Sequence, residues 1–187
     1  MSLTESKMLE LGVEAPNFIL PDTISGRNIS YEEVSSDKKG TLVMFICNHC
    51  PYVLHVIEEV KKLTDEYMSK GIGVVAISSN DVKNYPADSP EKMKEFAAKY
   101  DLNFPYLYDE SQNVARAYDA ACTPDFYLFD EDDKLIYRGR LDGSRPNNDE
   151  PLTGKDLRDA LDRLLDGRPQ SKEQYPSAGC NIKWKNN

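Results

Sequence analysis

The chain has 187 residues, of which 40% are hydrophobic and 29% charged, a composition typical of one soluble globular domain. Its formal net charge is −9 without a dense Lys/Arg cluster, which argues against nucleic-acid and anionic-membrane partners. The longest apolar run, residues 42–47, is too short to span a bilayer, and the first residues lack the pattern of a secretory signal. Four cysteines are too few for a disulfide-stapled scaffold. We therefore expect a cytoplasmic protein.

The first third of the chain predicts a hairpin and then a buried strand. Residues 17–20 lie between two prolines and predict a short strand, and Ile29 begins its partner after the turn residues 25–28. The continuous apolar run 41–46 is typical of a strand that is covered on both faces. Residues 1–40 are therefore expected to form an N-terminal hairpin extension of the domain.

Helices and strands alternate through the rest of the chain. Apolar residues recur at helical spacing after residue 50, at Val53, Val56, Ile57, Val60 and Leu63. Further strands are expected at 72–78, 105–108, 126–129 and 135–137, the last two as an antiparallel hairpin, and further helices at 86–100, 114–118 and 157–165. This order predicts an α/β fold with a central mixed sheet flanked by helices.

The chain ends in a tail, residues 167–187, that we assign to the same domain (residues 1–187). In this tail Ile182 and Trp184 alternate with lysines, which predicts a strand at the edge of a sheet.

Two cysteines two residues apart, in Cys47-Asn-His-Cys50, lie between the buried strand and the amphipathic helix. Pro51 favours a helix that begins there, because proline is tolerated in the first turn. Free N–H groups and the helix dipole at this end stabilise a thiolate, and a protonated His49 adds to the effect. The pattern predicts a dithiol that opens and closes as a disulfide, with Cys47, His49 and Cys50 as its catalytic residues.

A zinc site is the alternative interpretation of these cysteines, and inert packing is a third. Structural zinc needs four ligands, and the nearby candidates besides the cysteines are His49 and His55. Four ligands within nine residues at a helix start would be poorly arranged, and Cys122 and Cys180 belong to no second ligand pair. We therefore expect no metal and no other cofactor.

The chain resembles the thioredoxin-like superfamily and, within it, the redoxin (AhpC/TSA) branch. The resemblance rests on residues 11–22, the Cys47–Cys50 motif, and segments 122–130 and 137–142. It is most specific for a peroxiredoxin-like group of "CNHCP" proteins that end in Gly-Cys-x-Ile-Lys-Trp. It implies a thioredoxin-like fold in which Thr123 and Pro124 form a cis-proline loop that faces the dithiol and binds substrate.

Within that superfamily the resemblance points to two activities. When Cys50 is aligned with the peroxidatic cysteine of peroxiredoxins, the expected threonine position holds Cys47, and the expected arginine falls near Pro124. Arg116, Arg138 and Arg140 remain candidates to replace that arginine. The missing donors favour thiol–disulfide exchange, with Cys47 as the attacking thiolate and Cys50 as the resolving thiol.

The same comparison suggests an oxidising couple. The position of the buried Asp of thioredoxin-type reductases, six residues before the first cysteine, holds Thr41. Together with His49, this predicts a higher reduction potential than that of thioredoxin.

The other two cysteines are possible additional redox thiols. Cys122 precedes the predicted loop and is expected there as a small packing residue or a third redox thiol. Cys180, in the tail, is expected either as a resolving thiol or as a structural residue.

We thus predict a thiol–disulfide oxidoreductase that acts on a protein or small-molecule disulfide and is recharged by a thiol reductant. The alternatives are a thiol peroxidase with Cys50 as the peroxidatic residue and a hydroperoxide as substrate, and a redox-sensing binding module.

Overall fold

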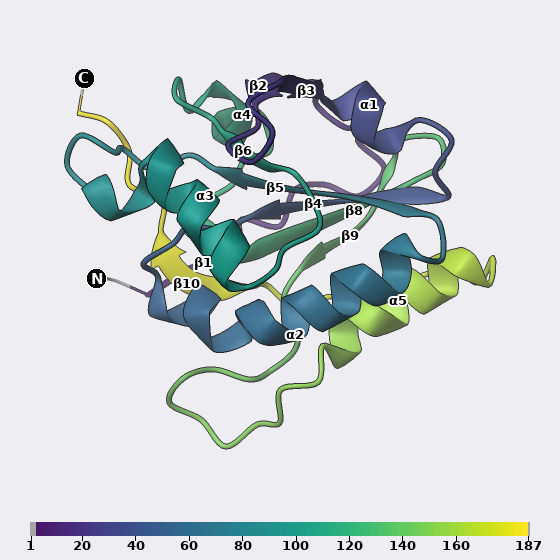
Figure 1. Ribbon diagram of the computed structural model, residues 1–187. Coiled ribbons are helices and arrows are strands. Elements are labelled where there is room, and N and C mark those ends of the chain that lie inside the picture. The colour runs from purple at the N-terminus through teal and green to yellow at the C-terminus, as the bar shows by residue number, and fades with distance from the viewer. Residues whose placement is uncertain (1–2, 187) are drawn as a thin grey trace.

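A five-stranded mixed sheet forms the centre of the computed structural model, which describes residues 3–186 (Figure 1). Its strand order is β6-β5-β4-β8-β9. β4, β5 and β6 run parallel, whereas β8 lies antiparallel to β4 and β9 antiparallel to β8. The bounds are β4 (Gly40–Phe45), β5 (Ile72–Ser78), β6 (Tyr106–Tyr108), β8 (Asp125–Asp130) and β9 (Leu135–Gly139). The predicted central mixed sheet and its C-terminal hairpin are confirmed.

Helices cover both faces of this sheet, as the alternation of elements predicted (Figure 1). The helices on one face are α2 (Pro51–Met68), α3 (Pro90–Lys99) and α5 (Lys155–Leu165). The opposite face carries α1 (Tyr31–Ser35), α4 (Asn113–Ala117) and the hairpin of β2 (Ile19–Pro21) and β3 (Asn28–Ser30). The hairpin that residues 17–29 predicted is therefore present.

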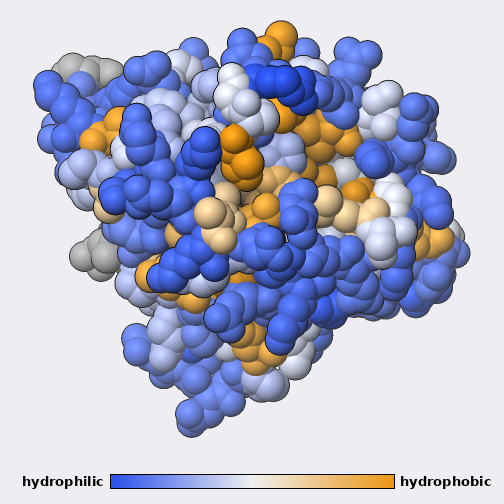
Figure 2. Space-filling model, in the orientation of Figure 1, coloured by the Kyte–Doolittle hydropathy of each residue, from blue (hydrophilic) through white to orange (hydrophobic). Residues whose placement is uncertain are grey.

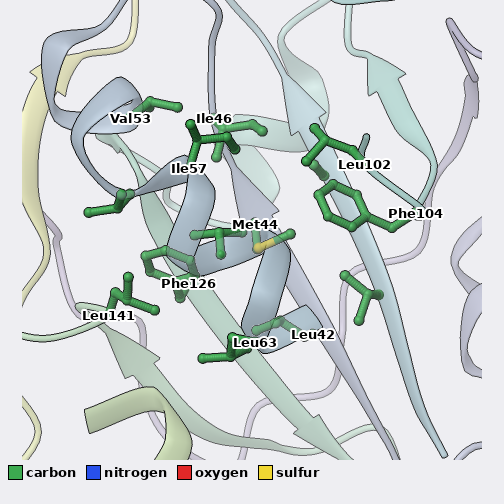
Figure 3. Packing of buried hydrophobic residues seen from close by; sticks show 14 of the residues in the cluster. Leu42, Met44, Ile46, Val53, Ile57, Leu63, Leu102, Phe104, Phe126 and Leu141 are labelled. Carbon is green, nitrogen blue, oxygen red and sulfur yellow. The ribbon is translucent and has the colours of Figure 1, made fainter. Parts of the chain in front are cut away.

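The sheet has a hydrophobic core on each of its faces, and alternate residues of the segment that begins with β4 pack into one core or the other. Met44 and Ile46 point toward α2 and meet Val53 and Ile57 from that helix and Phe126 from β8 (Figure 3). Every residue of β4 is buried, which is why its sequence is continuously apolar rather than alternating. This double burial holds the carboxyl end of β4, and thus the start of α2, in a fixed position.

A second sheet of three strands corrects the prediction for the tail. Its order is β1 (Leu3–Glu5), β10 (Ala178–Asn181) and β7 (Cys122–Thr123), with both pairs antiparallel. The tail strand is therefore central in its sheet, and the predicted edge position is wrong. Ile182 is buried just beyond the strand and Trp184 is exposed. Alternation reports which side chains are buried but not how many neighbours a strand has.

The outer surface agrees with the acidic, charge-rich composition. Hydrophilic side chains cover most of the face shown in Figure 2, with smaller apolar areas between them. None of the helices formed by residues 3–186 has the length and apolar character needed to cross a membrane.

Candidate active site

The two cysteines of the motif lie where the sequence placed them, at the carboxyl end of β4 and the start of α2. Cys50 is the N-cap residue of α2 and Pro51 opens the helix. Both cysteines are free thiols, and both are buried, with 1% of Cys47 and none of Cys50 exposed to solvent. A reaction with an external substrate therefore requires some part of the covering structure to move.

The Thr123–Pro124 peptide bond is cis, and it lies against the dithiol. The Sγ of Cys47 is 3.5 Å from the hydroxyl oxygen of Thr123. The Cys50 thiol, when it carries a proton, donates to the carbonyl of Thr123 over 3.4 Å. The predicted contact between a cis-proline loop and both cysteines is thus present.

The tail strand occupies the backbone edge of that loop. Cys180 is paired with Thr123 and Asn181 with Cys122, in antiparallel register. The edge that was predicted to receive a substrate segment is therefore covered by the chain's own residues 178–181. Figure 1 shows β10, in yellow, beside the start of α2.

The pKa shifts of the two thiols favour a thiolate on Cys50, whereas the sequence predicted Cys47 as the attacking thiolate. The pKa of the Cys50 thiol is lowered by a hydrogen bond from Cys47, and further by the Cys180 thiol and by the N–H groups of Val53 and Cys180, although burial opposes this. The pKa of the Cys47 thiol is raised by its hydrogen bond to Cys50, by burial and by the negative Asp88. Among the donors to Cys50 is the N–H of Val53 in the first turn of α2, and together these donors favour a thiolate on Cys50.

An ion pair between His49 and Asp88 stands beside the dithiol. The Nδ1 of His49 is 2.6 Å from Oδ2 of Asp88, and the imidazole ring stacks on the ring of Tyr85. Asp88 has no exposed surface and also accepts the N–H of Asn48 (2.8 Å) and the side-chain amide of Asn80 (2.9 Å). The hydrogen bond to Asp88 raises the pKa of His49, although burial of the ring opposes it. Burial acts to raise the pKa of Asp88, but the bonds from His49, Asn80 and Asn48 outweigh it and lower that pKa.

Sequence reasoning missed Asp88. It ends the short 3-10 helix η1 (Pro86–Asp88), nearly forty positions from the cysteines in sequence, and no local motif marks it. Its carboxylate acts on the charge of Cys47, whereas Thr41 lies on the opposite face of β4, in line with Val43 and Phe45. A buried acid therefore lies beside the dithiol although the position six residues before Cys47 holds Thr41.

The ligand set considered for zinc is not brought together. His55 bonds to the hydroxyl of Ser144 instead (2.8 Å). Cys47, His49 and Asp88 do each offer a ligand atom, all within 4.8 Å of one another. The two carboxylate oxygens of Asp88 are, however, already used by the backbone of residue 48, by Asn80 and by His49. These groups form a hydrogen-bonded network that fits a proton-handling role at the dithiol.

The remaining cysteines differ in their surroundings. Cys122 is fully buried, and its Sγ lies 3.9 Å from the carbonyl oxygens of both Pro124 and Ser177. Burial raises its pKa, as does the negative Asp125. Cys122 therefore fits the packing role. Cys180, in contrast, is paired with Thr123, whose carbonyl oxygen lies 3.4 Å from the sulfur of Cys50.

The arginines proposed as peroxidase substitutes are engaged elsewhere. Arg138 donates to a backbone carbonyl (2.8 Å) and to a glutamine side chain (2.7 Å). Arg140 forms an ion pair with an aspartate on α5 (2.6 Å), and Arg116 lies over the ring of the tail tryptophan (5.0 Å). These contacts do not bring a guanidinium group to Cys50.

A cis-proline loop opposite a dithiol on a central mixed sheet defines the thioredoxin-like class. A putative thiol:disulfide interchange protein DsbE from Chlorobium tepidum has the same fold, with a TM-score of 0.64 and 22% identity over 84% of this chain and 99% of that one. The redoxin family model matches residues 10–157, and the chain belongs to the redoxin family.

Two further proteins are similar to this chain, one at higher and one at lower sequence identity. The crystal structure of an uncharacterized conserved protein from Geobacillus kaustophilus is 56% identical, with a TM-score of 0.98 and coverage of 100% of this chain and 98% of that one. The thiol-disulfide oxidoreductase ResA of Bacillus thuringiensis subsp. konkukian (strain 97-27) is 26% identical over 133 residues, 71% of each chain. The family assignment agrees with the resemblance drawn from the sequence motifs.

Proposed function

We propose that this protein is a thiol–disulfide oxidoreductase that uses Cys47 and Cys50 on a protein or small-molecule disulfide. The observation that carries the proposal is the contact of both thiols with Thr123, beside the cis Pro124, at a helix N-terminus that holds the thiolate on Cys50. The similarity to the oxidoreductase ResA supports it. We also keep the proposal that the protein works in the cytoplasm, which cell fractionation tests.

The proposed reaction proceeds in two exchanges. The Cys50 thiolate attacks one sulfur of the substrate disulfide, which forms a mixed disulfide and releases the other substrate sulfur as a thiolate. Cys47 then attacks the sulfur of Cys50, which forms the Cys47–Cys50 disulfide and releases the second substrate thiolate. The proton that Cys47 loses passes to a departing substrate sulfur. An external thiol reductant reverses these steps on the enzyme.

His49 and Asp88 would adjust this chemistry by charge. The imidazolium ion favours the nearby Cys50 thiolate, while the carboxylate keeps Cys47 protonated until it must attack. Stabilising the reduced form in this way makes the couple more oxidising, so we propose a reduction potential above the value of about −270 mV typical of thioredoxin.

Equilibration against graded glutathione buffers, with the thiols quenched and the disulfides mapped by mass spectrometry, tests the proposal. We expect a reversible Cys47–Cys50 bridge. With a disulfide substrate, Cys47→Ser should accumulate a mixed disulfide at Cys50, whereas Cys50→Ser should not. A potential at or below that of thioredoxin would contradict the oxidising character, and absence of the bridge would contradict the exchange mechanism.

A thiol peroxidase remains the second candidate, favoured by one observation, the thiolate on Cys50. Hydroperoxide consumption by the reduced protein separates the two. A peroxidase loses that activity in Cys50→Ser and keeps part of it in Cys47→Ser. Under the exchange mechanism, wild type turns over disulfides much faster than hydroperoxides, and both substitutions abolish that turnover. A redox-sensing module would instead show negligible turnover with either substrate.

A further inference from the structure

The tail strand β10 is fitted closely to the cis-proline loop. A Cβ atom added to Gly179 would lie 1.9 Å from the carbonyl oxygen of Thr123 and 3.3 Å from the Cδ of Pro124, so a side chain cannot be accommodated there without a shift. The hydroxyl of Ser177 donates to the carbonyl of Pro124 (2.5 Å). The tail thus passes the active site at backbone contact distance.

Contacts on both sides of β10 hold it in this position. Leu3–Glu5 pairs with its outer edge. Beyond the strand, the N–H of Lys183 donates to the side chain of Asn80 (2.8 Å), and its carbonyl accepts the N–H of Asp81 (2.8 Å). The side-chain amide of Asn80 also donates to Asp88, so Asn80 connects the tail to the His49–Asp88 pair.

This placement brings Cys180 close to Cys50. Cys180 is paired with Thr123, whose carbonyl lies 3.4 Å from the sulfur of Cys50. Hydrogen bonding from the thiol and from the backbone N–H of Cys180 contributes to the lowered pKa of Cys50. Cys180 is 3% exposed, and Cys47, Cys50 and Cys180 belong to one buried cluster. Cys50 therefore has two other thiols, those of Cys47 and Cys180, in its immediate surroundings.

We propose that Cys180 is a third redox thiol, which attacks the Cys50 sulfur of the Cys47–Cys50 disulfide and forms a Cys50–Cys180 disulfide. The inference rests on the proposed function, because it uses the disulfide that the exchange reaction creates. In this step the S–S bond between Cys47 and Cys50 breaks as the new bond forms, and Cys47 leaves as a thiolate that takes up the proton lost by Cys180. No electrons enter or leave, so neither an oxidant nor a reductant is needed.

The strand pairing makes β10 an internal counterpart of a substrate segment. It presents an extended backbone to Thr123 and a cysteine to Cys50, as an incoming disulfide-bearing strand would. A Cys50–Cys180 disulfide would fasten the tail over the loop. The Cys47–Cys50 disulfide leaves the tail held by noncovalent contacts alone, so the two isomers differ in how easily the site opens.

Disulfide mapping by mass spectrometry, after incubation with oxidised glutathione and an acid quench, tests the proposal. We expect wild type to contain both the Cys47–Cys50 and the Cys50–Cys180 disulfides in an equilibrating mixture. Cys47→Ser should convert to the Cys50–Cys180 disulfide. Adding Cys180→Ser to that variant should remove the bridge and leave a glutathione adduct on Cys50.

Cys122→Ser is the matched control, because Cys122 is equally buried beside the same loop but bonds to backbone carbonyls. Adding it to Cys47→Ser should leave the Cys50–Cys180 bridge unchanged. The proposal is overturned if Cys47→Ser forms only the glutathione adduct, or bridges Cys50 to Cys122. A wild type with a Cys47–Cys50 bridge but none to Cys180 refutes the inference alone, whereas a wild type without the Cys47–Cys50 bridge refutes the proposed function as well.

Discussion

At the scale of single residues, the buried carboxylate of Asp88 raises the pKa of Cys47 directly and also forms an ion pair with His49. Asp88 accepts hydrogen bonds from the N–H of Asn48 and from Asn80 and forms an ion pair with His49, so removing it would leave these buried groups without their partner. His49 was expected from its place in the motif, but its partner Asp88 comes from η1, which is distant in the sequence. The motif therefore predicts the presence of the imidazole and not its charge.

The pH dependence of stability follows from that pair. The pKa of His49 is raised above 6.5, so its contribution is complete below pH 6.5 and is lost as pH rises through the higher folded value. The pKa of Asp88 is lowered below 3.8, so its contribution is complete above pH 3.8 and is lost as pH falls through the lower folded value. The pair stabilises the fold most between these two limits.

We therefore expect His49→Gln to lower the free energy of unfolding by about 2 kcal/mol near pH ~5.5 and by much less near pH ~9. Denaturant unfolding of wild type and variant across this range measures the difference. His55→Gln is the matched control, since His55 bonds to the hydroxyl of Ser144 rather than to a carboxylate. A His49→Gln difference that stays constant with pH would contradict the charged pair.

At the scale of elements, the contact between β10 and the cis-proline loop keeps the dithiol buried. Gly179 permits that contact because it has no Cβ. The carbonyl oxygen of Thr123, which a Cβ at Gly179 would meet, also contacts the sulfur of Cys50. The element that closes the active site is thus the one that the sequence assigned to a sheet edge.

Gly179→Ala should push β10 away from Thr123. We expect a loss of roughly 1–3 kcal/mol of stability, as for other overpacked contacts, together with faster alkylation of Cys50 in the native, reduced protein. Timed alkylation followed by peptide mapping measures the access. Gly143→Ala is the control, because a Cβ there has its nearest contact at an ordinary 3.7 Å. Unchanged alkylation of Cys50 in a destabilised Gly179→Ala would show that the tail does not limit access.

At the scale of the whole molecule, the low pKa of Cys50 links folding to redox state. The folded protein lowers this thiol's pKa from 9.0 to about 5, so its contribution to the stability of the reduced fold is complete above pH 9.0, decreases below it, and is lost as pH falls through about 5. A disulfide removes the thiolate and its stabilisation.

We accordingly expect the reduced protein to unfold at a higher temperature than the oxidised protein near pH ~7.5, with the difference shrinking toward pH ~5. Calorimetry of both forms at several pH values measures it. The Cys50→Ser variant should show no such dependence on the reductant. An oxidised form that is more stable throughout would contradict both the thiolate assignment and the oxidising couple.

The mixed sheet and the position of the dithiol follow from local sequence patterns, whereas the redoxin class came from a resemblance to known family motifs. The apolar run before Cys47, the proline after Cys50 and the helical stripe each act within a few residues, so they can be interpreted without knowledge of the rest of the chain. The Thr123–Pro124 loop was also placed correctly, by its resemblance to a known motif rather than by any physical rule acting on the residues themselves.

Other features depend on segments that are far apart in the chain and meet only in the folded protein. Asp88 reaches His49 across η1, and Cys180 reaches Cys50 across a strand pairing with Thr123. Together with the hydrogen bond from Cys47 to Cys50, these contacts favour a thiolate on Cys50, and the strand pairing covers the loop. The sequence by itself determined which chemical groups the protein has for redox chemistry, and the tertiary structure decided which of them carries the charge and what covers it, because hydrogen bonding, burial and Coulomb interactions depend on distances in space.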